Sequence, residues 1–189
     1  MVCSRLGATQ VILTDHDEQS LTHMRQDCET NQVLANVCKL DWFNPPSSTS
    51  SSSSFFNSFN ININNNNNNK NDDNDNIEEL EELELVLVAG DVLYKHALIE
   101  PFFSTVDILF DQYLSINKIQ TNPILPKLLL CHVPRAGVEH VEILASAKTH
   151  GLKVQEIGLQ EWQKGNLLQS DFVPLDDTNR AKVYMMQRF

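Results

Sequence analysis

Three aspartates of this sequence lie at the ends of strand-like apolar runs. Asp15 ends the first run, Asp41 ends the second, and Asp91 comes just after the third. Ligands of open α/β sheets bind beyond the carboxyl ends of the strands, so these three carboxylates are expected to face one crevice. A carboxylate accepts two hydrogen bonds, which suits the two hydroxyl groups of a ribose. Aspartate is also a good helix N-cap, so a second interpretation of Asp15 is a cap on the helix that follows.

The segments around these aspartates alternate between strand and helix patterns. We expect strands at 11–15, 37–42, 85–89, 127–133, 153–157 and 181–187, and helices at 17–31, 97–114 and from about 138 to 150. Alternation of this kind predicts an α/β fold with a mostly parallel sheet and helices on both faces.

Residues 47–79 differ sharply in composition from the rest of the chain. They are almost all Ser, Asn and Asp, with few apolar residues. Such a stretch cannot bury enough surface to offset the entropy lost on ordering. Strand patterns resume on both sides, so we interpret 47–79 as a disordered insertion within a single domain spanning 1–189. Long loops cost little stability, which makes such an insertion tolerable.

Charge, hydropathy and cysteine usage exclude several classes of function. Eight acids lie between residues 72 and 84, and without them the net charge of −11 becomes −3. No basic cluster is present for a nucleic acid. No apolar stretch reaches the roughly 18 residues of a membrane span, and the first residues do not form a secretory signal, so a cytoplasmic or nuclear location is expected. The four cysteines form no CxxC pair, so no metal is predicted.

The ordered set of segments resembles a known family. The pieces are Leu6-Gly7-Ala8, the strand ending in Asp15, a helix ending in Asn31, Leu40-Asp41-Trp42, and Gly90-Asp91-Val92-Leu93-Tyr94. In this order they resemble the seven-β-strand (class I) protein methyltransferases of the methyltransferase-like "family 16" group. The last piece matches the acid-x-x-aromatic motif that follows the fourth strand in that group. The resemblance covers nearly the whole chain outside the insertion. It implies a Rossmann-like fold in which the two last strands form the family's antiparallel final hairpin.

The resemblance implies S-adenosylmethionine as the cofactor. Asp15 would then hold the ribose hydroxyls, and Gly90 would also contact the cofactor. Asp41 and Trp42 would lie at the adenine, where the acid or a backbone amide reads the base edge and the ring packs near its face.

The resemblance also implies a protein substrate whose nitrogen, usually that of a lysine side chain, receives the methyl group. Asp91 would lie beside the methyl group and the amine, and Tyr94 would help to shape the substrate channel. A carboxylate attracts a cationic amine and favours its charged form, so Asp91 is expected to position the amine rather than act as a strong base. Pro134 and Arg135, after the strand at 127–133, are expected to border the substrate opening.

The sequence departs from the family at its first strand and glycine-rich loop, which are not recognisable. In the family's sheet order the missing strand lies between the strands at 11–15 and 85–89, so two inner edges would lack partners. We therefore expect a truncated chain or a pseudoenzyme with weak or no cofactor binding. A non-catalytic interaction module derived from a methyltransferase is the main alternative. A nicotinamide-dependent oxidoreductase and a receiver domain using Asp15, Asp17 and Asp91 are less well supported by the pattern.

Overall fold

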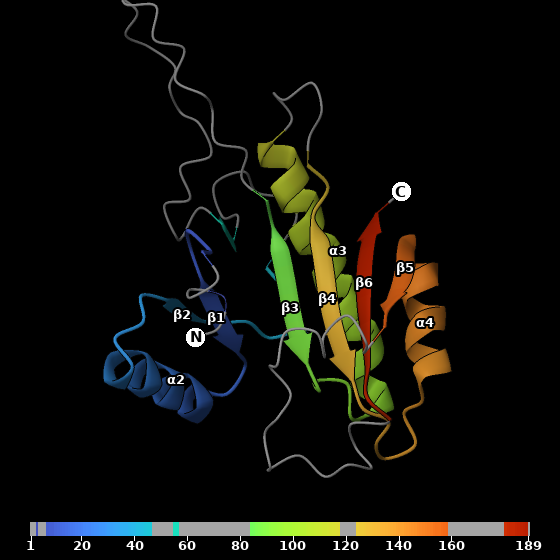
Figure 1. Cartoon of the computed structure of the whole chain (residues 1–189), viewed down its shortest axis with the longest axis horizontal. Helices are drawn as coiled ribbons and strands as arrows, with labels where there is room; N and C mark the ends of the chain where they lie inside the picture. Colours follow the sequence, from blue (N-terminus) through green and yellow to red (C-terminus); the bar gives the residue numbers. More distant parts are fainter. Residues whose placement is uncertain are drawn as a thin grey trace, which may run out of the picture. The chain divides into compact units, whose positions relative to one another are not determined.

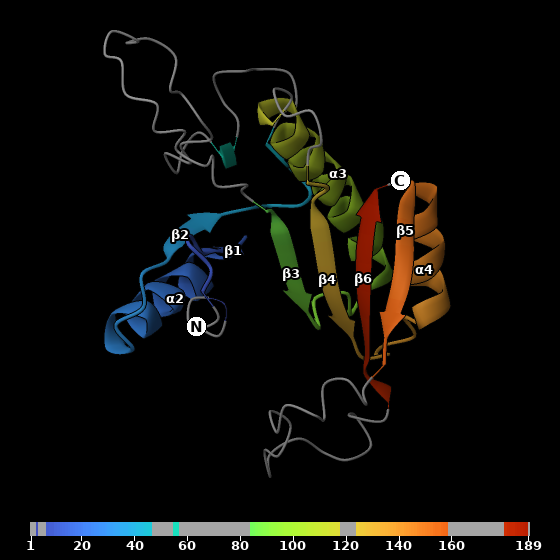
Figure 2. The ribbon, with the colours of Figure 1, turned by 45° about the horizontal axis from the view of Figure 1, so that its top comes forward.

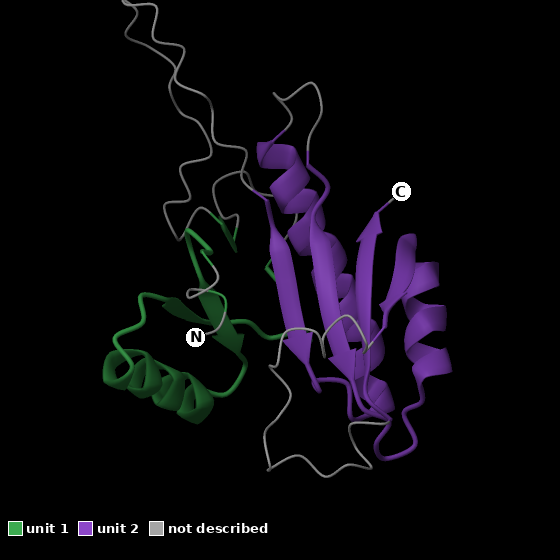
Figure 3. Ribbon diagram, viewed as in Figure 1, with its two compact units in different colours: residues 1–59 green, residues 60–189 purple. Residues whose placement is uncertain are grey.

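The computed structural model describes residue 3 and residues 7–46, 55–56, 84–117, 124–158 and 180–188. It divides into two compact units, residues 1–59 and 60–189 (Figure 3). The boundary falls within the expected insertion at 47–79, which lies outside the described residues apart from 55–56. Each unit is described by itself, and the expectation of one domain over 1–189 stays a prediction.

Unit 1 is a strand–helix–strand element (Figure 1). It comprises β1 (Ile12–Asp15), α2 (Glu18–Thr30) and β2 (Asn36–Lys39), and β1 pairs with β2 in parallel. Asp17 caps α2, because its carboxylate accepts a hydrogen bond of 2.8 Å from the backbone N–H of Ser20. Leu21 and Cys28 on one face of α2 are buried, as the helical spacing predicts.

Unit 2 contains a four-stranded sheet with two helices on one face (Figure 2). Its elements are β3 (Val86–Gly90), the short 3₁₀ helix η2 (His96–Leu98), α3 (Ile99–Ile116), β4 (Lys127–His132), α4 (His140–Thr149), β5 (Leu152–Ile157) and β6 (Lys182–Arg188). The strand order is β3-β4-β6-β5. β3 and β4 are parallel, whereas β6 is antiparallel to both β4 and β5. The predicted α/β class is confirmed as a mixed α/β fold, and the predicted final antiparallel hairpin is confirmed as β5–β6.

The covered face of this sheet forms the core of unit 2. Alternate residues of β4, Leu128 and Leu130, are fully buried, as is Met186 of β6. Phe103 and Phe110 of α3 are also fully buried. Burying one such side chain stabilises the fold by about 1.5–3 kcal/mol, so α3 is anchored chiefly by these apolar contacts. Among the described helices, none is long and apolar enough to cross a membrane.

The opposite face of the sheet is more open at β3. Leu87 and Ala89 alternate with Val86 and Val88, and the two valines are 42% and 63% exposed. Within the described part of the chain, β3 pairs with β4 alone, so its other edge has no strand partner. A continuous apolar strand of this kind is typical of a sheet interior.

A charged network connects α3, α4 and β6. His150, at the C-cap of α4, is 2.5 Å from Asp107 through Nδ1 and 3.1 Å from Glu100 through Nε2. Arg188 of β6 pairs with Asp107 at 3.2 Å and also with Asp111. Burial opposes the charge on His150, but its hydrogen bonds to Asp107 and Glu100 outweigh burial and raise its pKa.

His132 of β4 has the opposite electrostatic environment. Its side chain is fully buried, and burial lowers its pKa, although a hydrogen bond of 3.3 Å to the Val138 carbonyl opposes the change. The neighbouring ring of His140 contributes in the same direction as burial. His132 is therefore kept uncharged in the core, whereas His150 is kept charged at its margin.

These two histidines predict a maximum in stability near the ordinary histidine pKa of about 6.5. The raised pKa of His150 gives stabilisation that is complete below this pH and is lost as pH rises through the folded pKa. The lowered pKa of His132 gives stability that is lost as pH falls below about 6.5 through its folded value. Urea unfolding across this range measures the free energy at each pH.

The variant His150→Gln should no longer lose stability as pH rises above about 6.5, but it should still lose stability as pH falls below that value. We expect it to cost about 1–2 kcal/mol at mildly acidic pH, the size of a charge-assisted hydrogen bond in a partly buried site. The exposed His23 of α2 offers a matched control, because His23→Gln should leave the profile of unit 2 unchanged. If His150→Gln still lost stability at alkaline pH, a titrating group other than His150 would be responsible for that loss.

Candidate functional site

Asp15 and Asp41 lie at the same edge of unit 1. In the parallel register Asp15 is opposite Lys39, and the N–H of Leu40 donates to the Asp15 carbonyl at 2.9 Å. Asp41 therefore lies two residues after the end of β2, at the same edge of the sheet as Asp15, the last residue of β1. The pairing of β1 with β2 brings these two predicted residues together.

Asp15 stabilises the turn into α2 without capping the helix. Its Oδ1 accepts a hydrogen bond of 2.9 Å from the N–H of Asp17 and lies 3.2 Å from the ring of His16. The cap is Asp17, so the interpretation of Asp15 as the helix cap is wrong. The side chain of Asp15 is 30% exposed, and its Oδ2 accepts no hydrogen bond from the described residues, so this oxygen is available to a ligand.

Asp41 is occupied by a local turn. Its Oδ2 accepts from the side-chain amide of Asn44 and its Oδ1 from the N–H of Phe43, both at 2.9 Å. The bond from Asn44 and then the bond from Phe43 lower the pKa of Asp41, so its carboxylate is ionised at neutral pH. Both oxygens are engaged, which favours the backbone rather than the carboxylate as the group that would read a base edge. Trp42 is half-buried, while Phe43, not anticipated from the sequence, is 61% exposed beside it.

Asp91 occupies a strained position at the carboxyl end of β3. Its N–H donates to the Cys131 carbonyl at 2.8 Å, and its φ is +54°, in the left-handed region that few residues other than glycine adopt. Oδ2 pairs with Arg135 at 3.1 Å. Oδ1 is buried without a hydrogen-bond partner among the described residues. A buried acceptor without a partner is costly, so Asp91 presents an oxygen that a ligand donor would satisfy.

Tyr94 and Arg135 complete the surroundings of Asp91. The ring of Tyr94 is 45% exposed, with the Lys95 ammonium 5.6 Å from its centroid. Arg135 follows β4, where the sequence predicted a border of the opening, and its ion pair with Asp91 agrees with that position. The sequence analysis did not anticipate Lys95. The one feature of the sequence that could have indicated it is its position directly after Tyr94.

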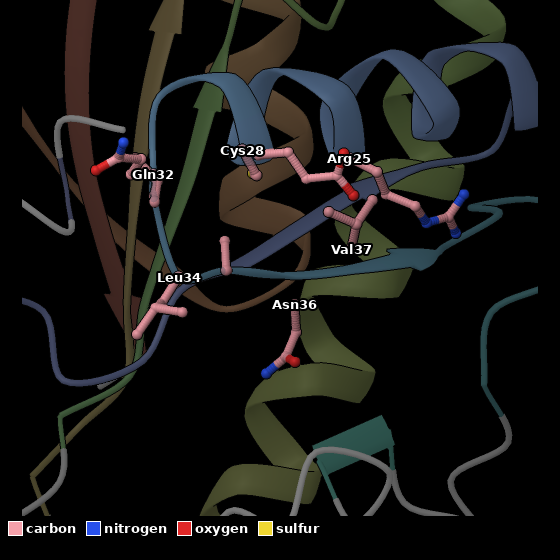
Figure 4. Close-up of a pocket in the computed structure, with 9 residues that line it drawn as sticks. Arg25, Cys28, Gln32, Leu34, Asn36 and Val37 are labelled. Atoms are coloured by element: carbon pink, nitrogen blue, oxygen red, sulfur yellow. The ribbon is translucent and has the colours of Figure 1, made fainter.

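A separate concavity of about 500 Å³ lies at the other end of β2 (Figure 4). It lies between the last turns of α2, with Arg25 and Cys28, and the segment leading into β2, where Leu34 is 92% exposed. Val37 projects towards α2, and Asn36 projects away from it. Because Asp41 follows the opposite end of β2, this concavity is distinct from the edge that carries Asp15 and Asp41.

The predicted site residues fall into two groups. Asp15, Asp41 and Trp42 belong to unit 1, whereas Gly90, Asp91 and Tyr94 belong to unit 2. Each group lies beyond the carboxyl end of its parallel strands. The convergence of both groups on one crevice stays a prediction.

No protein-family model matches the sequence, and no curated protein matches it.

Gly90 offers a direct test of how open the end of β3 is. A Cβ at this position meets no atom within 4 Å, and the backbone is not left-handed there. We expect Gly90→Ala to change the unfolding free energy by less than about 0.5 kcal/mol in urea titrations. Gly137, by contrast, has a φ of +84°, so Gly137→Ala should cost about 1–2 kcal/mol. A cost for Gly90→Ala equal to that for Gly137→Ala would mean that other residues of the chain pack against the end of β3.

Proposed function

We propose that this chain has the site of an S-adenosylmethionine-dependent methyltransferase acting on a protein nitrogen, with lysine as the preferred acceptor. The observation that carries the proposal is the shared edge of Asp15 and Asp41 in unit 1. Two acids beyond the ends of adjacent parallel strands are suited to a nucleoside, whose ribose and base must be held side by side. The family resemblance of the sequence supports the same assignment.

The residues of unit 1 fit the nucleoside part of the cofactor. Oδ2 of Asp15 is available to accept hydrogen bonds from a ribose diol, and its side chain is only partly exposed. The turn at Asp41 contains two consecutive aromatic residues, Trp42 and Phe43. An aromatic face of this kind packs well on a flat base, while the neighbouring backbone can read the base edge.

Asp91 fits the role of a positioning group for the acceptor amine. When bound, the cofactor supplies an electrophilic methyl group on a sulfonium sulfur. The buried Oδ1 of Asp91 has no donor among the described residues, and an amine N–H would satisfy it. Arg135 holds the other oxygen, so the carboxylate is fixed in direction before the amine arrives. The acceptor ammonium would first have to lose a proton to solvent, and Asp91 would then orient the neutral amine through a remaining N–H.

The proposal includes a Rossmann-like, mostly parallel arrangement of the chain. The parallel pairs β1–β2 and β3–β4 support it. The antiparallel β6 between β4 and β5 matches the reversed final hairpin that the family resemblance implies. A second candidate is a non-catalytic module that binds a partner without turnover. The exposed Val86 and Val88 on β3 favour this candidate, because exposed apolar surface often marks an interaction site.

Ligand-observed NMR provides the test, since it detects weak complexes. We expect S-adenosylhomocysteine to bind the full chain weakly and its 2′-deoxy analogue to bind about fivefold more weakly, because the analogue lacks one hydroxyl for Asp15. Asp15→Asn should abolish this difference. Asp27→Asn, at an exposed position of α2, is the matched control and should preserve it.

The outcome separates the two candidate functions. Equal binding of the two nucleosides, or a difference that survives Asp15→Asn, would contradict the assignment of Asp15 to the ribose. Complete absence of nucleoside binding would favour the non-catalytic module. Where binding is seen, transfer of a labelled methyl group to a lysine peptide should fall at least tenfold in Asp91→Asn, because the amine loses its orienting charge.

A further inference from the structure

A small concavity beside Asp91 is built from two segments that are distant in the sequence. It has a volume of about 400 Å³ and is lined by Pro134, Arg135, Ala136, Gly137, Glu139 and Arg180. Its rim is the tight turn from Arg135 to Val138, closed by a backbone hydrogen bond of 2.9 Å. Ala136 and Gly137 both have positive φ, +51° and +84°, as a type I′ turn requires. The rim is therefore short and held in one conformation.

Arg180 is fixed at both its backbone and its side chain. Its guanidinium donates through Nη2 to the Pro134 carbonyl at 2.9 Å. Its own carbonyl accepts from Nε2 of His140 at 3.1 Å, so that ring nitrogen carries a proton. A guanidinium held in this way has lost much of its rotational freedom already, which reduces the entropy cost of binding a ligand.

Arg180 is a cation without a carboxylate partner in the described part of the chain. Arg135, the other arginine of the concavity, pairs with Asp91 at 3.1 Å. The acid of the lining, Glu139, takes part in a capping box with Glu142 at the start of α4. Among the described residues, Arg180 is therefore the cation of this lining that has no ion-pair partner, while Glu139 keeps its own charge at the start of α4.

We propose that Arg180 binds a carboxylate of the protein substrate, an Asp or Glu close in sequence to the acceptor nitrogen. A planar guanidinium matches a carboxylate in a two-point contact. A single unpaired arginine suits one negative charge, whereas phosphorylated groups are usually bound by arginine clusters. Arg135 contacts Asp91 and also lines the concavity, so the two binding points are neighbours. The position of Asp91 at the amine rests on the proposed function, but the carboxylate preference does not.

The test is an NMR titration of the isotopically labelled full chain with two synthetic Gly/Ser peptides. Each peptide has one lysine, and the position next to it carries glutamate in one peptide and glutamine in the other. We expect the glutamate peptide to bind about fivefold more tightly, near the upper limit for an exposed ion pair. The side-chain Nε–H signal of Arg180 should shift only with the glutamate peptide. Arg180→Gln should bind both peptides as weakly as the wild-type chain binds the glutamine peptide.

A control variant and a third peptide make the outcome decisive. Lys153→Gln, at an exposed position of β5, removes one charge elsewhere in unit 2 and should leave the preference intact. Equal binding of the two peptides, no binding of either, or a preference that survives Arg180→Gln would overturn the proposal. A phosphoserine peptide that binds at least tenfold more tightly than the glutamate peptide would overturn the carboxylate assignment. A preference seen without any nucleoside binding would retain the Arg180 site and reject the methyltransferase function.

Discussion

Parallel strand pairing is the constraint on which the arrangement of the candidate site depends. In β1–β2 and in β3–β4 the pairing aligns the carboxyl ends of the strands, with Asp15 opposite Lys39 and Gly90 opposite Cys131. Parallel neighbours also require a crossover, which α2 and α3 supply. The helices can therefore bury their apolar faces, while the loops beyond the strand ends remain available for polar side chains. Apolar residues within the helices and strands are thus used for packing, whereas the polar residues that follow the strand ends are left for the candidate site.

The second contribution comes from charges that hold the helices of unit 2 in register. His150 between Asp107 and Glu100, together with Arg188, connects α3, α4 and β6. The side chains of His150, Asp107 and Arg188 are largely buried, whereas that of Glu100 is exposed. Polar pairs of this kind contribute directionality rather than large stabilisation, because desolvation offsets much of their attraction. The apolar anchors Phe103 and Phe110 supply most of the free energy, and the charged network specifies the orientation in which they pack.

Much of the secondary structure could be predicted from the sequence, because the apolar runs are strong and clearly bounded. The run at 85–89 became β3 (Val86–Gly90), and the pattern at 97–114 became α3 (Ile99–Ile116) with a 3₁₀ turn before it. The interpretation of Asp15 as the helix cap was wrong, because Asp17, two residues further on, is an equally good cap by residue type and lies directly before the helix. The ion pair of Asp91 with Arg135 joins residues on different loops. The strand pattern predicted that both residues follow strand ends, but a single sequence carries no signal for the pairing of their side chains. The direction of a carboxylate likewise depends on tertiary neighbours.

The geometry of Asp91 shows how local strain and a binding role can be linked. Aspartate tolerates the left-handed region better than most residues, because its short polar side chain can interact locally. The strain is sustained because the β3–β4 ladder continues through the bond from the Asp91 N–H to Cys131, and Arg135 restrains the side chain. Release of the strain would require breaking both contacts. Among the described residues, the same two restraints leave Oδ1 buried without a hydrogen-bond donor, so the conformation keeps one acceptor unpaired. An amine N–H that reached this oxygen, once its neighbours moved aside, would recover the cost of the unpaired acceptor. This recovery is the physical basis for the role that we propose for Asp91.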